Sequence, residues 1–241
     1  MIHFISIFLL TILASFIQRT TGFGFGIFIM TVLPYLLPSY GEATTLSGML
    51  AMTTSAVVSY RMRRYLNWHH LVPILLTFIA VSTVAIFCLK RMDDVILRRV
   101  LGVVLILTSA YFCLLSNRIK LGTKLPTQIG AGAISGLMGG FFGMQGPPAV
   151  LYFIQTTKDK NEYMALAQTY FFLGNVMMLC VRAYNGFLTL PVCRSYLYGI
   201  GGVVIGMAIG GYVFRHLPQQ TFKYVVYAYI GISGIIILLT T

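Results

Sequence analysis

Acidic side chains are scarce in this sequence. The chain holds five Asp and Glu against 17 Lys and Arg, and charged residues of both signs make up only 9% of it. A soluble domain carries about 25% charged residues, so this chain lacks the polar surface that a water-soluble fold needs. The acids are interpreted as turn and loop residues, Glu42 included. This argues against the intramembrane carboxylate relay that many proton-driven pumps use.

The sequence also lacks the patterns of a metal site or a catalytic centre. It has no HExxH, no GxSxG and no carboxylate pair, which are the arrangements that common hydrolytic chemistries need. The Gly-Phe-Gly-Phe-Gly stretch at 22–26 lies in apolar sequence without a βαβ unit, so a nucleotide loop is rejected. His69 and His70 adjoin Trp68 and are interpreted as membrane-interface anchors. We therefore expect no enzyme activity, no cofactor and no metal.

The cysteines give no structural framework either, because none of them forms a CxxC pair. They lie in or beside apolar segments and are interpreted as small buried hydrophobes. They are Cys88, Cys113, Cys180 and Cys193.

Apolar sequence is what the chain has in abundance. Hydrophobic residues make up 58% of it, and its mean hydropathy is +0.85. About 20 apolar residues cross a bilayer as a helix, and six segments meet that standard: 42–60, 69–89, 95–115, 162–181, 192–214 and 220–240. The net charge of +12 falls in short basic runs between these segments, which is typical of membrane topology rather than of nucleic-acid binding. The sequence predicts an all-α, polytopic membrane protein.

The N-terminal segment is expected to stay in the protein. It is apolar but has neither a positively charged start nor an A-x-A cleavage site, so it is unlike a cleaved signal peptide. We therefore expect a multi-pass protein of the cell (inner or plasma) membrane.

Two further segments, 3–37 and 126–157, are too long for one straight helix, which at 1.5 Å per residue would reach about 50 Å. Polar and glycine-rich stretches interrupt them at 18–26 and 139–148. Gly and Pro break helices, and unpaired backbone at membrane depth persists only inside protein or beside a water-filled cavity. Each segment is therefore predicted to form two half-helices around a short unwound stretch.

The chain is self-similar at a period of about 120 residues, which predicts two repeats, 1–120 and 121–241, within one structural domain. Ser15 and Ser135 precede the two breaks, and Arg63-Arg64-Tyr65 recurs as Arg182-Ala183-Tyr184. If all eight segments span, Lys and Arg divide evenly between the two sides. If the broken segments are re-entrant hairpins, the basic loops gather on one side. The count favours three full spans per repeat, and hence inverted repeats.

The first break is the most informative stretch. Arg19 lies in apolar sequence, where a charge costs about 3 kcal/mol or more. Nearby hydroxyls, glycines and a half-helix N-terminus would suit an anion, and the second break offers a similar set. Gln168 and Asn175, one heptad apart, are weaker candidates. The predicted substrate-binding residues are Gln18, Arg19, Thr20, Thr21, Gly22, Gly24, Gly143, Gln145, Gly146, Gln168 and Asn175.

A structural interpretation of these residues stays open. Arg19 would then extend to the membrane interface, and the glycines would only allow helices to pack closely. Polar residues elsewhere in the spans, such as Ser55 and Thr169, are interpreted mainly as hydrogen bonds between helices.

With these features the chain resembles the TauE/SafE sulfite and sulfonate exporter family over nearly its whole length. The resemblance rests on a glycine-rich break followed by proline in both halves (22–34 and 143–148), on the Arg-Arg-Tyr…Asn67-Trp68 junction, and on the ending at 210–239. It implies a bacterial or archaeal permease of two repeats that binds its substrate at their interface. The first break is not a run of consecutive glycines and the second carries Met144-Gln145 between glycines, so the resemblance does not assign the ligand.

The sequence thus predicts a secondary permease or exporter of a small anion, of which sulfite and sulfoacetate are examples. An anion channel and a non-transporting accessory protein are the alternatives. The expected partners are the substrate anion and the lipid bilayer, with no nucleic acid, and association into a homo-oligomer is left open.

Overall fold

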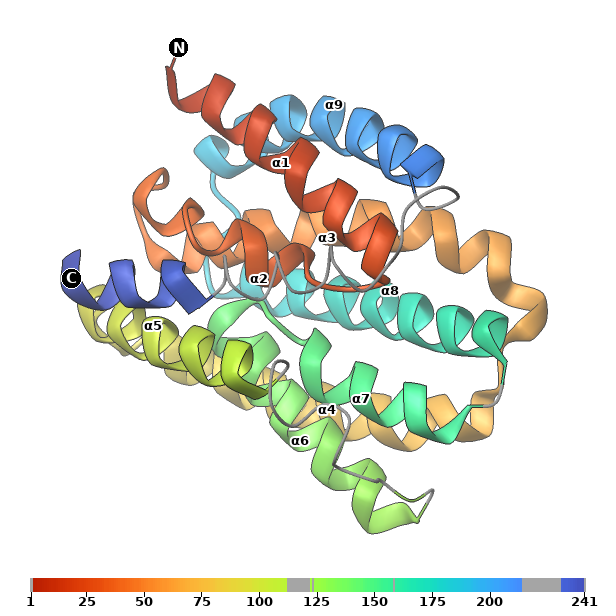
Figure 1. Cartoon of the computed structure of the whole chain (residues 1–241). Helices are drawn as coiled ribbons and strands as arrows, with labels where there is room; N and C mark the ends of the chain where they lie inside the picture. Colours follow the sequence, from red (N-terminus) through yellow and green to blue (C-terminus); the bar gives the residue numbers. More distant parts are fainter. Residues whose placement is uncertain (1, 112–121, 123, 158, 214–230, 241) are drawn as a thin grey trace.

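The computed structural model describes residues 2–111, 122, 124–157, 159–213 and 231–240 (Figure 1). Regular structure in this part of the chain is entirely helical, which confirms the predicted all-α class. The first half contains α1 (Ile2–Thr21), α2 (Phe25–Ile29), η1 (Leu33–Tyr35), α3 (Tyr40–Met62), η2 (Arg63–Tyr65), α4 (Trp68–Leu89) and α5 (Asp94–Ala110). The second half contains α6 (Leu125–Phe142), α7 (Gly146–Thr156), α8 (Lys160–Tyr184), α9 (Leu190–Val213) and a final helix, Gly231–Thr240.

The predicted spans coincide with helices wherever the structure describes them. Segments 42–60, 69–89, 162–181 and 192–214 are α3, α4, α8 and α9, and 95–115 begins as α5. The segment at 220–240 is described only from Gly231. Among the described helices, α4, α8 and α9 are long and apolar enough to cross a membrane. The helix α3 is as long, but its many Thr, Ser and Gly residues make it less apolar.

Polar side chains cap the helices of the first half. The Ser39 hydroxyl accepts a hydrogen bond from the backbone N–H of Glu42 at 3.2 Å, and Asp93 accepts one from Val95 at 2.7 Å. Such caps satisfy N–H groups that have no partner within the helix. Glu42 therefore lies in the first turn of α3 and is buried. Its assignment to a turn outside the helix was wrong, because Ser39 starts the helix three residues earlier.

Both predicted breaks are present. The helix α1 ends at Thr21, and Gly24 has a φ of 99° just before α2. The helix α6 ends at Phe142, and Gly143 has a φ of 67°. Gly22, which directly follows α1, also has a positive φ, of 86°. Glycine adopts such angles without strain, so Gly22 and Gly143 stop α1 and α6 where the sequence predicts. The following half-helices differ, because α2 has 5 residues and α7 has 11.

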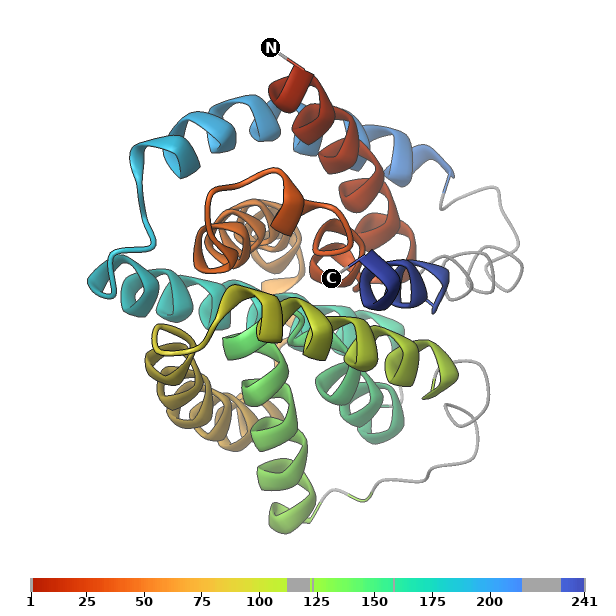
Figure 2. The same cartoon turned by 90° about the vertical axis from the view of Figure 1, so that its left-hand side faces the viewer.

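Two pairs of helices pack closely through glycines. The helix α1 lies along α9, and α6 lies along α4, with α3 and α8 between the pairs (Figures 1 and 2). A Cβ on Gly206 of α9 would overlap the carbonyl oxygen of Ile12, and one on Gly136 of α6 would lie 2.9 Å from Val81. Small residues four apart let helix backbones approach in membranes. They are Gly132, Gly136 and Gly140 on α6, and Gly202, Gly206 and Gly210 on α9.

The middle of the molecule is formed by α3 packed on α8 (Figure 2). Ser59 and Thr169 form an interhelical hydrogen bond of 2.8 Å there, as expected of polar residues in these helices. The described cysteines do not follow their interpretation as buried residues, since Cys88 and Cys180 are exposed and Cys193 is partly buried; Cys113 lies outside the described residues. In a membrane protein a small apolar side chain is as stable against lipid as against protein, so composition did not distinguish these positions.

Candidate functional site

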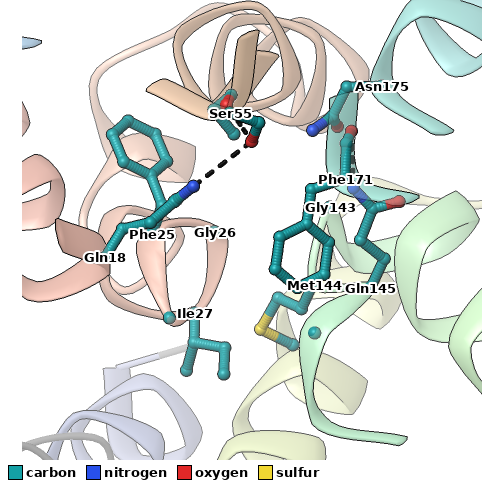
Figure 3. A pocket seen from close by; sticks show the side chains of 13 residues that line it. Gln18, Phe25, Gly26, Ile27, Ser55, Gly143, Met144, Gln145, Phe171 and Asn175 are labelled. Atoms are coloured by element: carbon teal, nitrogen blue, oxygen red, sulfur yellow. Dashed lines mark hydrogen bonds between the residues drawn. The ribbon is translucent and has the colours of Figure 1, made fainter. Parts of the chain in front are cut away.

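The two breaks meet inside the molecule. A Cβ on Gly26, in α2, would overlap the carbonyl oxygen of Gly143 in the other break. Gly146 of the second break also faces the first break, since a Cβ on it would lie 3.7 Å from Phe23. Glycine permits this close approach of backbones. Stretches about 120 residues apart in the sequence therefore form one site (Figure 3).

A cavity of about 30 Å³ lies at this junction. A cavity needs about 10–15 Å³ of such space to hold one water molecule, so this one is small but has room for water. The residues that line it come from α1, α2, α3, α8 and the second break. They are Gln18, Gly24, Phe25, Gly26, Ile27, Ala51, Ser55, Gly143, Met144, Gln145, Gly146, Phe171 and Asn175.

Amide side chains supply most of the polarity of this lining. Gln18 donates from Nε2 to Ser55 at 3.3 Å (Figure 3). It also donates to Gln168 Oε1 at 3.4 Å. Gln168, two per cent exposed, donates in turn to the Gly22 carbonyl at 2.7 Å. Gln168 thus holds the first break from behind the lining, while Gln18 faces the cavity. Both residues were predicted to belong to the site.

Gln145 is the corresponding amide of the second break. Its Nε2 donates to the Phe171 carbonyl at 3.3 Å, and its buried Oε1 has no hydrogen-bond partner. Its backbone carbonyl accepts from Ser135, which accepts from the Tyr170 hydroxyl at 2.7 Å. The backbone at this position is therefore fixed, while part of the side-chain amide is left for another partner.

Arg19, Thr20 and Thr21 do not line the cavity. Both threonine hydroxyls donate to backbone carbonyls within α1, those of Phe16 and Ile17. The Arg19 stem packs against Gly210 of α9, where a Cβ on the glycine would lie 2.8 Å from the arginine Cβ. Of the predicted residues, Gln18, Gly24, Gly143, Gln145, Gly146 and Asn175 line the cavity.

Arg182 is a residue that the sequence interpretation misplaced. It was assigned to the loop after the segment at 162–181, but α8 continues to Tyr184 and buries Arg182 to one per cent exposure. Its guanidinium donates to the carbonyls of Gly139 and Gly140, at 3.0 Å each, and to that of Thr44. The spacing of polar residues in the sequence could have identified Arg182. Gln168, Asn175 and Arg182 follow one another at seven residues, and this places them along one face of α8.

Several polar atoms around the second break lack partners. Besides Gln145 Oε1, they include Ser47 Oγ and Arg182 Nε, all of them buried. A Cβ on Gly143 would lie 3.6 Å from Ser47 Oγ, so this hydroxyl is next to the break. Buried polar groups are almost always hydrogen-bonded, and unsatisfied ones indicate a place for a water, an ion or a ligand.

The half-helix N-termini contribute less than the sequence suggested. The helix α2 is too short to carry a large dipole. The helix α7 begins with Gly146, Pro147 and Pro148, and proline has no N–H to offer an anion. Side-chain amides and the backbone of the breaks are therefore the main donors. Among the described residues no three His, Cys, Asp or Glu side chains come together in a way that could hold a metal.

Comparison with known proteins agrees with this architecture. The family model for the sulfite exporter TauE/SafE matches residues 7–237. A protein of Cupriavidus necator named probable sulfite/organosulfonate exporter TauE is 21% identical over 200 residues, covering 81% of this chain and 78% of that protein. No solved structure matches the chain. Because the match spans nearly all of the sequence, both breaks included, the chain belongs to the sulfite exporter TauE/SafE family of membrane transporters.

Proposed function

We propose that this protein is a carrier that moves a small sulfur-containing oxyanion or organosulfonate, such as sulfite or sulfoacetate, across the cell membrane. The observation that carries the proposal is the cavity at the junction of the two breaks, lined by the amides of Gln18, Gln145 and Asn175. Amide N–H groups donate hydrogen bonds that sulfite and sulfonate oxygens accept. Family membership and the name of the Cupriavidus relative support the same class of substrate.

The site lies between two halves that we propose to be inverted repeats, 1–120 and 121–241. The packing supports this relation, because the first helix of each half lies along a helix of the other half: α1 along α9, and α6 along α4. Both contacts use glycines spaced four apart. Substrate sites of secondary transporters lie at such repeat interfaces, between discontinuous helices. Rocking of one half against the other would open the cavity to each side in turn.

A carrier fits the cavity better than a channel does. A channel needs a continuous water-filled path, whereas this cavity measures about 30 Å³. Gly26 and Gly143 are in backbone contact beside it. Exchange of an anion through such a site requires a conformational change for each cycle, and the rate should saturate with substrate.

The test is exchange of radiolabelled sulfite by purified protein in liposomes. We expect uptake that depends on internal unlabelled anion, that saturates, and that gives no current steps in a planar bilayer. Empty liposomes and heat-denatured protein serve as controls. Unitary currents would assign a channel instead. Absence of exchange for sulfite, sulfoacetate and other small anions by correctly folded protein would overturn the proposal.

A further inference from the structure

Arg182 carries a buried charge without a carboxylate partner. The three groups that its guanidinium reaches are backbone carbonyls, and its Nε has no hydrogen-bond partner. The ionisable group against it is the phenol of Tyr40, which is itself fully buried. The ion pair of His70 with Glu162 does not involve Arg182.

Such a charge is costly unless something compensates for it. Ionisable residues inside membrane proteins usually pair with each other or face a substrate path, because an unpaired charge in a low dielectric loses its hydration. The carbonyls of Gly139 and Gly140 offset part of this loss, since a guanidinium is stabilised at the negative end of a helix, and the Thr44 carbonyl in α3 accepts a further hydrogen bond. They carry partial charges only. A net positive charge therefore remains at the end of α6.

This charge lies directly behind the cavity. Gly48 of α3 locates it, because a Cβ there would lie 3.5 Å from Asn175 Oδ1 and 3.6 Å from Arg182 Nη1. Asn175 lines the cavity, whereas Arg182 does not. The carbonyls that Arg182 holds belong to the last turn of α6, which leads into Gly143 in the cavity wall. Arg182 thus connects the electrostatics of the site to the position of the second break.

We propose that Arg182 is the positioning residue that makes this cavity selective for anions: its guanidinium holds the end of α6 against α3 and supplies the positive charge for which the substrate is the counter-ion. This inference rests on the proposed carrier function. It predicts that the cavity prefers an anion to a neutral molecule of the same shape. A guanidinium that only capped α6 would produce no such preference.

The test compares methanesulfonate with dimethyl sulfone, a neutral molecule of similar shape, through the thermal stabilisation that each gives to purified protein. For the wild-type protein we expect stabilisation by methanesulfonate alone. Arg182→Gln should lose it, with a half-saturating concentration raised by about tenfold or more. Arg182→Lys should retain the preference in weakened form, because it keeps the charge but not the planar fork. Equal anion preference in wild-type protein and folded Arg182→Gln would overturn the proposal.

A second variant remains informative if Arg182→Gln does not fold. Asn175→Asp places a carboxylate beside Arg182 without removing the arginine. We expect the ligand-free protein to melt at the wild-type temperature or above it, since the buried charge gains a partner, and anion stabilisation to disappear. Undiminished stabilisation of Asn175→Asp by methanesulfonate would contradict the inference. If wild-type protein exchanges sulfite in liposomes while either contradiction holds, the inference fails and the proposed function stands. If wild-type protein exchanges no anion, the proposed function itself fails.

Discussion

Gly26 of the first break and Gly143 of the second are in direct backbone contact, so close that a Cβ on Gly26 would overlap the Gly143 carbonyl oxygen. This contact joins the two halves of the chain at the cavity. Two breaks that were recognisable separately in the sequence therefore form a single junction, and the junction has no space for a side chain on Gly26.

Gly26→Ala should force the two breaks apart. Overpacking of this kind costs about 1–3 kcal/mol, because the methyl group would meet backbone, which cannot move aside as a side chain can. We expect a melting temperature lower by at least about 3 °C and a loss of most sulfite exchange. Melting curves in detergent and liposome uptake measure the two effects.

Gly130→Ala is the matched control for Gly26→Ala. Gly130 also lies in a helix, α6, but a Cβ there would meet nothing within 4 Å. Alanine favours a helix by about 1 kcal/mol over glycine, so this variant should be at least as stable as the wild type. If Gly26→Ala melted and transported like Gly130→Ala, the contact between the breaks would not constrain the site.

Gln18 and Gln168 should act as a unit. Gln168 bonds the Gly22 carbonyl at 2.7 Å and accepts from Gln18 at 3.4 Å. Gln168→Leu leaves the Gly22 carbonyl unpaired, which costs about 1–3 kcal/mol. After that change Gln18→Leu should cost less than it does alone, with a coupling of about 0.5 kcal/mol or more. Denaturant melts of the two single variants and the double variant measure this coupling.

Thr83 provides the control for this double-mutant comparison. Its hydroxyl donates to Ile79 and Met177 rather than to either glutamine. Thr83→Ala combined with Gln18→Leu should be additive within about 0.5 kcal/mol. Additivity of the Gln18 and Gln168 changes as well would contradict the hydrogen-bonded link.

Gln145→Glu should impair transport more than loss of the Gln145 amide does, because it also adds a negative charge. The side chain lines the cavity and keeps one unpaired oxygen, so a carboxylate there would repel an incoming anion. We expect sulfite exchange to fall by about tenfold or more. Gln145→Met removes the amide without adding charge and should retain more activity than Gln145→Glu. Initial rates at several sulfite concentrations separate weaker binding from slower turnover. Equal activity of the two variants would show that no anion approaches this position.

The helices and their interruptions could be predicted from the sequence because both depend on local chemistry. Apolar length determines a span, and a glycine with positive φ, such as Gly143, ends a helix in almost any surroundings. The length of α2 could not be read in the same way. Residues 30–37 are apolar, but there the chain forms turns and the short η1 rather than a longer helix. Pro34, which has no N–H to donate to Met30, is one local reason that a helix does not continue there.

Site residues were predictable where they adjoin the breaks and less so where a distant helix supplies them. Gln18, Gln145 and Asn175 were expected and line the cavity. Arg182 was assigned to a loop because charged residues usually end apolar segments. Its partners, the carbonyls of Gly139, Gly140 and Thr44, belong to other helices. No pattern along α8 reveals such long-range contacts. The seven-residue spacing of Arg182 from Asn175 indicates only that both lie on one face of α8.

Arg19 and Arg182 give opposite predictions for the source of positive charge. The sequence assigns this role to Arg19, but the stem of Arg19 packs on Gly210 of α9 and the residue does not line the cavity. Arg19→Leu keeps much of the apolar stem and removes the charge. We expect it to fold, to exchange sulfite within about threefold of the wild-type rate, and to keep the preference for methanesulfonate over dimethyl sulfone. Loss of that preference in folded Arg19→Leu, with Arg182→Gln unaffected, would return the role to Arg19. The substrate would then bind at the end of α1, between α1 and α9, rather than beside α8.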